Sequence, residues 1–213
     1  TDRESNELHG YSPSLGITGV REAVAASLEK RFGLPYRKEH IFMASGAAGA
    51  LAHAFRLVTE PGDEILTFAP HFPEYGPYVN LTGAVLKVVP PDTESFQIHF
   101  GKFQEMLTEK VMAVLVNTPN NPSGVAYSAA TLQRLADLLR QKSAEYGHAI
   151  YLISDEPYRE IIFGGVDAPC VSAFYDDTIM CYSFSKSLSI PGERIGYAAV
   201  NPACKDAEDM VYM

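Results

Sequence analysis

A lysine stands among small hydroxyl residues directly after an apolar, β-rich stretch of the chain. Residues 178–183 read Thr-Ile-Met-Cys-Tyr-Ser and continue as Phe184-Ser185-Lys186-Ser187, with Arg194 close behind. An amine held at such a strand end, with hydroxyl groups and an arginine nearby, can be desolvated and become a nucleophile toward carbonyl carbons. A strand-end lysine whose ammonium group simply reaches solvent would show the same pattern. The other strand ends must therefore distinguish the two interpretations.

Two further hydrophobic runs end in polar side chains of distinctive types. Residues 149–154 lead to Asp155 and Tyr158, and a carboxylate at the end of a hydrophobic strand is costly unless another group pairs with it. Residues 112–117 lead into Thr-Pro-Asn-Asn-Pro-Ser-Gly, which places the amide of Asn121 in a turn at a strand end. A solvated loop acid remains the alternative interpretation of Asp155.

A glycine turn and an aromatic loop add two weaker signals. The run 41–44 is followed by Ser45-Gly46-Ala47-Ala-Gly and at once by a helix, an arrangement that aims backbone N–H groups and the positive helix end at an anion. The turn lacks the Gly-Lys-Ser/Thr of a P-loop and the first glycine of a dinucleotide fingerprint, and tight packing alone would also explain its glycines. Phe72, between two prolines after another strand, could stack on a flat ligand or form a lid over the core.

An alternation of strands and helices organises these strand ends. It predicts an α/β fold with three layers, α/β/α, in which helices cover both faces of a mainly parallel central sheet. Because the carboxyl ends of parallel strands lie along one edge, residues far apart in sequence can converge there. The first helix carries Val20, Val24, Leu28 and Phe32 at helical spacing as its apolar side. We expect strands at 41–44, 64–69, 84–89, 112–117, 149–154, 178–183 and 195–200, and helices from Val20, after Gly46, and at 75–81, 102–109 and 128–146.

Composition and charge argue against several classes of protein. The chain has 213 residues, of which 46% are hydrophobic, enough for one large domain, and its formal net charge of -9 disfavours a nucleic-acid partner. No apolar run approaches membrane-spanning length and no signal peptide opens the sequence, so we expect no membrane partner. Cys170, Cys181 and Cys204 form neither a disulfide framework nor a zinc knuckle, and the histidines show no HExxH spacing. No metal site is predicted, and the cysteine pattern fits a reducing cytoplasm.

The residue types at the strand ends match the needs of one cofactor. A lysine can form an imine, an acid can pair with a protonated ring nitrogen, and an amide and a phenol can bind a phenolate oxygen. An aromatic side chain can stack on the ring, while hydroxyls, backbone N–H groups and an arginine can hold a phosphate. Together these are the partners of pyridoxal phosphate. A hydrolase would instead need a GxSxG elbow and a paired histidine, and neither is present.

The chain resembles the fold-type-I pyridoxal-phosphate enzymes, and more narrowly the class I and II aminotransferases. The resemblance rests on short stretches that occur in the family's order and cover nearly the whole chain. Each stretch is modest alone, and together they are highly specific. They are Tyr11-x4-Gly16, Ser45-Gly-Ala-Ala48, Pro70-His-Phe-Pro73, Asn117-Thr-Pro-Asn-Asn-Pro-Ser-Gly124, Ser154-Asp-Glu-Pro-Tyr158, Ser183-Phe-Ser-Lys-Ser187 and Gly192-Glu-Arg-Ile-Gly196.

The resemblance implies a role for each matching residue. Lys186 would hold the cofactor as an internal aldimine and later shuttle a proton, and Asp155 would keep the pyridine nitrogen protonated. Asn121 and Tyr158 would hydrogen-bond the 3-oxygen of the ring, and Phe72 would stack on its face. The other cofactor-binding residues would be Ser45 and Ser185, Gly46, Ala47, Ser183 and Arg194 around the phosphate, and Tyr11, which would reach the phosphate of a neighbouring subunit.

The resemblance also implies amino-acid and 2-oxo-acid substrates and a homodimer with active sites at the subunit interface. Residues 1–213 would form the cofactor-binding large domain, without the N-terminal arm and without the small C-terminal domain that carries the arginine for the substrate α-carboxylate. Three hypotheses follow: an aminotransferase, a lyase or decarboxylase on the same fold, and a truncated cofactor-binding domain without catalysis. The Asn-Asn-Pro-Ser-Gly loop and the spacing from Lys186 to Arg194 favour transamination.

Overall fold

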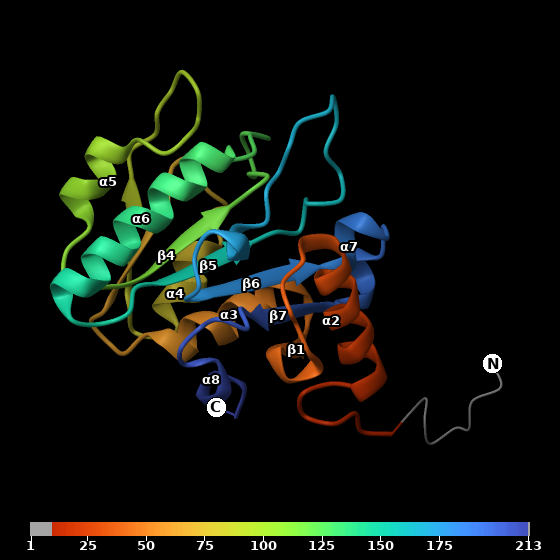
Figure 1. The fold of residues 1–213 in the computed structure, drawn as a ribbon. Coiled ribbons are helices and arrows are strands. Elements are labelled where there is room, and N and C mark those ends of the chain that lie inside the picture. Colours follow the sequence, from red (N-terminus) through yellow and green to blue (C-terminus); the bar gives the residue numbers. More distant parts are fainter. Residues whose placement is uncertain (1–9, 213) are drawn as a thin grey trace.

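The structure, a computed structural model, describes residues 10–212 as a seven-stranded sheet between two layers of helices (Figure 1). Its strands begin and end within two residues of the expected positions. They are β1 (Ile41–Ala44), β2 (Glu64–Phe68), β3 (Val85–Val89), β4 (Val111–Asn117), β5 (Tyr151–Asp155), β6 (Thr178–Ser183) and β7 (Gly196–Val200). The helices are α2 (Thr18–Phe32), α3 (Gly46–Val58), α4 (Tyr75–Asn80), α5 (Phe100–Met106), α6 (Ala129–Tyr146), α7 (Phe184–Ser187) and α8 (Ala207–Tyr212).

The strand order across the sheet is β1-β7-β6-β5-β4-β2-β3. Strands β2 to β6 pair in parallel, which confirms the predicted α/β class and mainly parallel sheet. Strand β7 is antiparallel to both of its neighbours, with Gly196 opposite Ala44 of β1 and Ser183 of β6. The start of β7 therefore lies at the same edge as the carboxyl ends of the other strands.

Alternating side chains along each strand divide the core between the two faces of the sheet. Val114 and Val116 of β4 pack toward α5 and α6, in a core layer that α2 continues against β1, β6 and β7. Ala113 and Leu115 face the other way, toward α3, α4 and α8. Figure 1 shows α2, α5 and α6 on one side of the sheet and α3, α4 and α8 on the other.

Helix α2 departs from the expected apolar side at its first turn. Val20 is 41% exposed, whereas Arg21 is 8% exposed. The Arg21 guanidinium donates from Nε to the carbonyl oxygen of Ile41 (2.8 Å) and from Nη2 to that of Lys38 (2.6 Å). The prediction that Val20 faces the core was wrong, because the arginine satisfies carbonyl groups at the entry to β1 and so takes the inward position.

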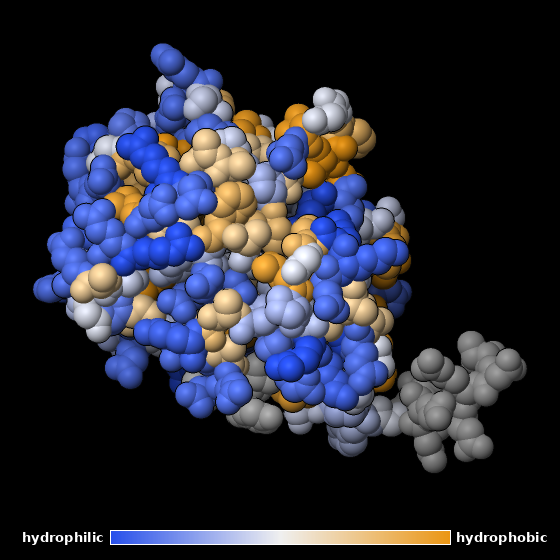
Figure 2. All heavy atoms as spheres, viewed as in Figure 1, coloured by the Kyte–Doolittle hydropathy of each residue, from blue (hydrophilic) through white to orange (hydrophobic). Residues whose placement is uncertain are grey.

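The surface is mostly hydrophilic over α5 and α6, while the loop after β5 carries an apolar tip at the upper right of Figure 2. In that loop Ile161, Phe163 and Val166 are exposed.

None of the helices within residues 10–212 combines the length and the apolar character needed to cross a membrane. In the same part of the chain, no cluster of histidine, cysteine, aspartate and glutamate side chains could hold a metal ion.

Candidate active site

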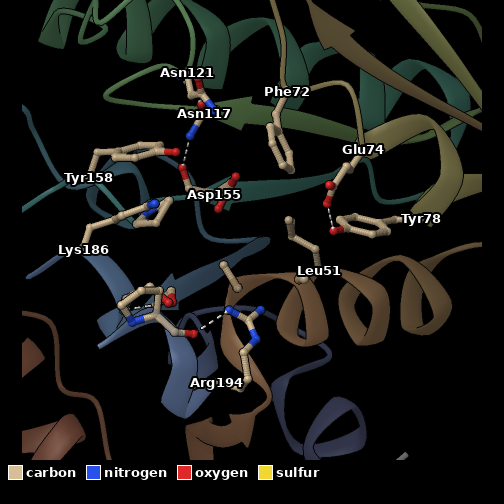
Figure 3. A pocket seen from close by; sticks show the side chains of 16 residues that line it. Leu51, Phe72, Glu74, Tyr78, Asn117, Asn121, Asp155, Tyr158, Lys186 and Arg194 are labelled. Carbon is tan, nitrogen blue, oxygen red and sulfur yellow. Dashed lines mark hydrogen bonds between the residues drawn. The ribbon is translucent and has the colours of Figure 1, made fainter. Parts of the chain in front are cut away.

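One cavity of about 350 Å³ opens where the strand ends converge (Figure 3). The carboxyl ends of β4, β5 and β6 meet there with the start of α3 and the segment that leads into β7. The predicted residues that line it are Ala47, Phe72, Asn121, Asp155, Tyr158, Ser183, Ser185, Lys186 and Arg194. Its other lining residues include Leu51, Glu74, Tyr78 and Asn117.

Lys186 lies in the short helix α7, which begins directly after β6. The Ser183 hydroxyl oxygen accepts a hydrogen bond from the Ser185 backbone N–H (3.2 Å) and caps this turn. The Ser183 and Ser185 hydroxyls also bond to each other at 2.8 Å. Lys186 is exposed, and its ammonium group forms no hydrogen bond or ion pair with any other described residue. Residues 10–212 therefore leave the amine of Lys186 in contact with solvent and do not desolvate it.

Asp155 ends strand β5 and is 5% exposed. Its Oδ2 accepts a hydrogen bond from the Tyr75 hydroxyl at 2.6 Å, and its Oδ1 is buried without a partner among the described residues. Burial raises the pKa of Asp155 to about 7, and the hydrogen bond from Tyr75 opposes that rise. The interpretation as a solvated loop acid is excluded, since the carboxyl group is buried and turns one oxygen toward a cavity.

The amide of Asn117 joins the ends of β4 and β5. Its Nδ2 donates to the Asp155 carbonyl oxygen (2.8 Å), and its Oδ1 accepts from the Asn121 backbone N–H (2.6 Å). Asn121 and Tyr158 lie on the same side of the cavity above Asp155 (Figure 3). Burial and the charge of Asp155 raise the pKa of the Tyr158 phenol, and the neighbouring Asn121 amide lowers it.

The opposite end of the cavity combines a helix N-terminus with an arginine. Gly46 begins α3 with φ of +72°, and a Cβ there would lie 2.8 Å from Nη2 of Arg194. Any larger residue at this position would therefore push the guanidinium away. Free backbone N–H groups, the positive end of a 13-residue helix and a guanidinium together form a site suited to a phosphate.

Arg194 reaches this place because β7 runs antiparallel to its neighbours. It lies two residues before Gly196, the first residue of β7, and adopts a left-handed backbone conformation (φ +51°). Its Nη1 donates a hydrogen bond to the Pro191 carbonyl oxygen at 3.2 Å. The close approach needs a glycine at 196 as well. A Cβ on Gly196 would lie 2.4 Å from the Tyr182 carbonyl oxygen and 2.9 Å from Cα of Gly46.

Phe72 lines the edge of the cavity, whereas Ser45, Gly46 and Tyr11 are not among its lining residues. Phe72 is half-buried, points toward the cavity and makes an edge contact with Tyr75, with ring centroids 5.6 Å apart. Ser45 is exposed at the N-cap of α3, and its side chain makes no capping hydrogen bond. Tyr11 is fully exposed and does not line the cavity, so the structure does not bring it together with the others.

The sequence interpretation missed two residues that hold the acid in place, Tyr75 and Asn117. The sequence pattern predicts only that a helix starts at Tyr75, whose ring is fully buried in the structure. Its hydrogen bond to Asp155 joins positions far apart in the sequence, and no local pattern marks it. Asn117 did carry a signal, since a buried amide at the end of an apolar strand needs partners for its donors and acceptor.

Comparison with known proteins agrees with this arrangement. Residues 2–211 match the family described as aminotransferase class I and II. The chain is 33% identical over 194 residues to a probable aspartate/prephenate aminotransferase of Aquifex aeolicus, covering 89% of this chain and 48% of that protein. It is 32% identical over 202 residues to the methionine aminotransferase of Escherichia coli, covering 93% and 50%. The chain thus spans about half the length of these relatives.

Solved structures that match the chain are also aminotransferases. A crystal structure of an amino transferase from Eubacterium rectale has a TM-score of 0.97 and 45% identity, and the match covers 100% of this chain and 54% of that one. The aromatic aminotransferase of Pyrococcus horikoshii has a TM-score of 0.85 and 27% identity, with 97% and 54% covered. The fold, the residues of the cavity and the sequence match all indicate the same family. The chain therefore belongs to the class I and II aminotransferases, a family that depends on pyridoxal phosphate.

Proposed function

We propose that residues 1–213 form the cofactor-binding domain of a pyridoxal-phosphate-dependent aminotransferase, which moves an amino group between an amino acid and a 2-oxo acid. The observation that carries the proposal is the convergence of Lys186, Asp155 and Arg194 on one cavity. These three side chains supply an amine, a buried acid and a phosphate-binding cation, and they come from different parts of the chain. The relatives named above are aminotransferases, and the same activity is proposed here.

The residues present fit the cofactor at two separate points. Asp155 Oδ1 is a buried acceptor without a partner among the described residues, which suits a protonated ring nitrogen. Gly46 leaves room for Arg194 beside the N-terminus of α3, which suits a phosphate. When bound, pyridoxal phosphate supplies an aldehyde that condenses with amines and a protonated ring that draws electrons from the substrate Cα.

Each residue then has a defined task. Lys186 Nζ would hold the cofactor covalently and, once free, move the proton to and from the substrate Cα. Asp155 would keep the ring nitrogen protonated, since a buried carboxylate gains a strong charge-assisted hydrogen bond from it. Asn121 and Tyr158 would hydrogen-bond the 3-oxygen, and Phe72 would stack on the ring. Their placement around the cavity supports these roles.

The phosphate would bind between the start of α3 and the segment that leads into β7. Arg194, the Ser183 and Ser185 hydroxyls and the backbone N–H groups of Gly46 and Ala47 would hold it, with Ser45 at the rim. Charge-assisted hydrogen bonds from a guanidinium and helix N–H groups suit a phosphate dianion.

We also propose that the parent protein is a cytoplasmic homodimer. Tyr11 supports this proposal because it is fully exposed and does not line its own cavity, as expected of a residue that reaches the phosphate of the partner subunit. The names of the relatives give different substrates, aspartate and prephenate in one and methionine in the other. The proposed substrates are therefore an amino acid and a 2-oxo acid as classes.

The test is to add pyridoxal phosphate to the purified 213-residue chain and follow visible absorbance. We expect an absorbing species that borohydride traps on the peptide containing Lys186, and that Lys186→Ala abolishes. A Lys186→Ala protein that still forms a reducible adduct at this site would refute the assignment. For the parent protein, we expect amino exchange between an amino acid and a 2-oxo acid. Release of ammonia or carbon dioxide without exchange would indicate a lyase or decarboxylase instead.

A further inference from the structure

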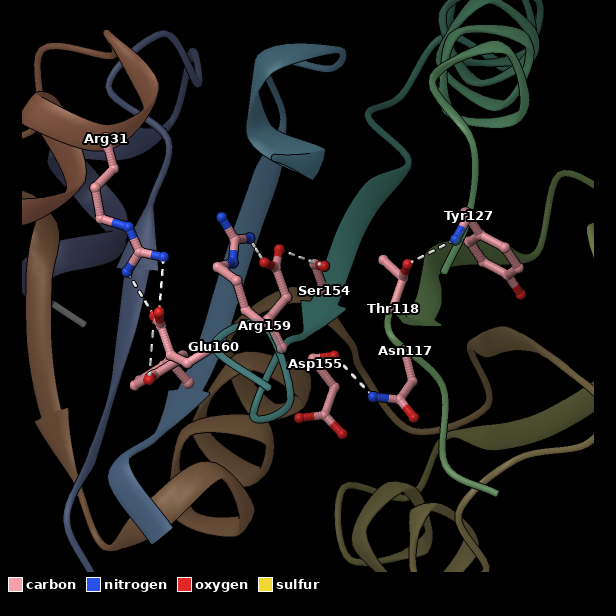
Figure 4. A network of polar contacts seen from close by, with 10 residues as sticks. Arg31, Asn117, Thr118, Tyr127, Ser154, Asp155, Arg159 and Glu160 are labelled. Atoms are coloured by element: carbon pink, nitrogen blue, oxygen red, sulfur yellow. Dashed lines mark hydrogen bonds and ion pairs between the residues drawn. The ribbon is translucent and has the colours of Figure 1, made fainter. Parts of the chain in front are cut away.

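The end of β5 and the turn after it send some side chains to the cavity and others to helix α2. Asp155 and Tyr158 line the cavity, whereas Arg159 and Glu160 contact the last turn of α2 (Figure 4). The position of the Tyr158 phenol therefore depends on how the other side of the turn is held.

An inner contact holds the turn from within the core. Glu156 is 1% exposed and Arg159 is 8% exposed, and their side chains form an ion pair. Glu156 Oε1 also accepts a hydrogen bond from the Ser154 hydroxyl at 2.7 Å. The Arg159 guanidinium lies over the ring of Phe32, 4.3 Å from its centroid, so the ion pair also contacts the end of α2.

An outer contact holds the next residue of the turn. Arg31 of α2 bonds Glu160 with two parallel hydrogen bonds, Nη1 to Oε1 at 2.5 Å and Nη2 to Oε2 at 2.9 Å. The two side chains are 39% and 28% exposed. A fork-to-fork pair fixes orientation as well as distance, so the two contacts together restrict the turn on both sides of its cavity-facing residue.

Stability alone gives little reason for a buried ion pair at this place. Removing both charges from a buried pair while keeping the volume is often neutral or stabilising, because the desolvation of the two ions is then avoided. Such a pair can instead select one geometry, since it forms only when both side chains are correctly placed.

We propose that the last turn of α2, through Phe32 and Arg31, positions Tyr158, with Arg159 and its partner Glu156 as the principal positioning residues and the Arg31–Glu160 pair as a secondary one. The inference rests on the proposed function, because it assigns Tyr158 to the 3-oxygen of the cofactor. It goes beyond that function by placing control of the phenol on residues outside the cavity.

The experiment is a double-mutant cycle on the whole 213-residue chain. One arm is E156Q/R159M, which removes both buried charges and keeps their volume, and the other is Tyr158→Phe. For each protein, and for the triple variant, three quantities are measured: the pyridoxal phosphate dissociation constant, the pH midpoint of the absorbance of the Lys186-bound cofactor, and the thermal midpoint of the chain without cofactor. Asp155, Asn121 and Lys186 face the phenol and remain unchanged throughout.

We expect E156Q/R159M to fold, to weaken cofactor binding about threefold to tenfold, and to raise the absorbance midpoint, since a displaced phenol no longer stabilises the deprotonated form. In the Tyr158→Phe background the same pair of changes should have less than about a twofold effect on binding and should leave the midpoint unchanged. Additive effects in the two backgrounds, or a changed thermal midpoint with an unchanged absorbance midpoint, would overturn the proposal.

The outer pair gives an independent check with a matched control. Glu160→Gln should weaken cofactor binding about twofold to fivefold, and the reversed pair R31E/E160R should restore most of it. Glu22→Gln removes another exposed ion pair of α2, the Lys38–Glu22 pair at 2.8 Å, which does not touch the turn, and should change binding less than about twofold. An equal loss in Glu22→Gln and Glu160→Gln would contradict the inference.

A failure of the proposed function would look different. If the wild-type chain forms no borohydride-trapped adduct on Lys186, the function is wrong and the inference falls with it. If the wild-type adduct forms and the cycle is additive, only the inference is wrong.

Discussion

Asp155 and Lys186 line the same cavity, yet the chain surrounds them in opposite ways. Around Asp155, the side chains of Tyr75 and Asn117 are buried and joined to it by hydrogen bonds to its carboxylate and its backbone. Around Lys186, the ammonium group is exposed and forms no hydrogen bond or ion pair with the described residues. Arg194 is exposed as well and bonds to the Pro191 carbonyl oxygen.

The difference follows from what burial costs. A buried carboxylate needs fixed partners, so folding must build the acid end of the cavity, while exposed cations are solvated and need none. We infer that the acid end is already ordered in the cofactor-free chain, with Asp155 Oδ1 left for the cofactor, and that the cationic end becomes ordered when the cofactor binds. The following substitutions test this contrast through the free energy of unfolding of the cofactor-free chain.

Asp155→Asn should have the largest effect, and it should stabilise. The folded-state pKa of about 7 lies above the ordinary value, so the wild-type chain loses stability as pH rises from about 4 through 7, when the unfolded state releases its proton more readily. The Asp155→Asn variant does not lose stability in this pH range, because the asparagine side chain does not ionise. Near pH 8 the variant should be more stable by roughly 4 kcal/mol, and near pH 4 the two proteins should be nearly equal. Chemical denaturation at both pH values measures this, and a gain of the same size at both would show that the charge is not the cause.

Asn117→Ala should destabilise the chain by about 2–3 kcal/mol, because it removes one buried and one partly buried hydrogen bond and leaves two backbone groups without their partners. Urea denaturation measures the loss. The comparison is Asn120→Ala at a half-buried position in the same loop, which removes three partly buried hydrogen bonds to Pro70 and Ser123; we expect a smaller loss of about 1 kcal/mol, because the groups left behind can reach solvent. Equal losses at the two positions would mean that Asn117 has no special place in the acid end.

Tyr75→Phe should destabilise the chain by about 1–2 kcal/mol near pH 8 and by less near pH 5. The Tyr75 hydroxyl bonds the ionised Asp155 and lowers its pKa, so its removal should move the pKa of Asp155 upward from about 7. An NMR titration of the Asp155 carboxyl carbon in both proteins reports this shift. An unchanged or lowered pKa would show that the hydrogen bond does not favour the charged form.

Arg194→Gln should have the smallest effect on folding, less than about 0.5 kcal/mol, since the side chain is exposed. The same change should weaken binding of pyridoxal phosphate by about tenfold, because the phosphate loses its guanidinium partner. Calorimetric titration measures the binding and thermal unfolding measures the stability. A large loss of stability without a loss of binding would place Arg194 in the fold and not in the site.

The same contrast explains what could be predicted from sequence. Asp155 ends an apolar strand, and Lys186 and Asn121 lie within a few residues after one, so local patterns place all three at one edge of the sheet. Tyr75 has no such mark, because its partner is on a strand far away in sequence. The buried Arg21 was likewise invisible, since only the folded entry to β1 provides the carbonyl groups that it bonds.

The prediction of a mainly parallel sheet leaves the direction of β7 open, although the sequence carries a signal for it. The connection 184–195 holds only the short helix α7 and a 3₁₀ turn, whereas a parallel crossover usually contains a longer helix. Such a short connection indicates an antiparallel return. It matters because it brings Arg194 to the edge where the other strands end.

The contrast between the two ends is tested most directly by amide hydrogen exchange of the 213-residue chain with and without pyridoxal phosphate. We expect residues 151–156 to be protected in both states, with rates that change less than about twofold. Residues 184–195 should exchange faster without cofactor and slow by about tenfold or more when it binds. Equal protection of the two segments in the cofactor-free chain, or a cofactor effect centred on 151–156, would contradict the account.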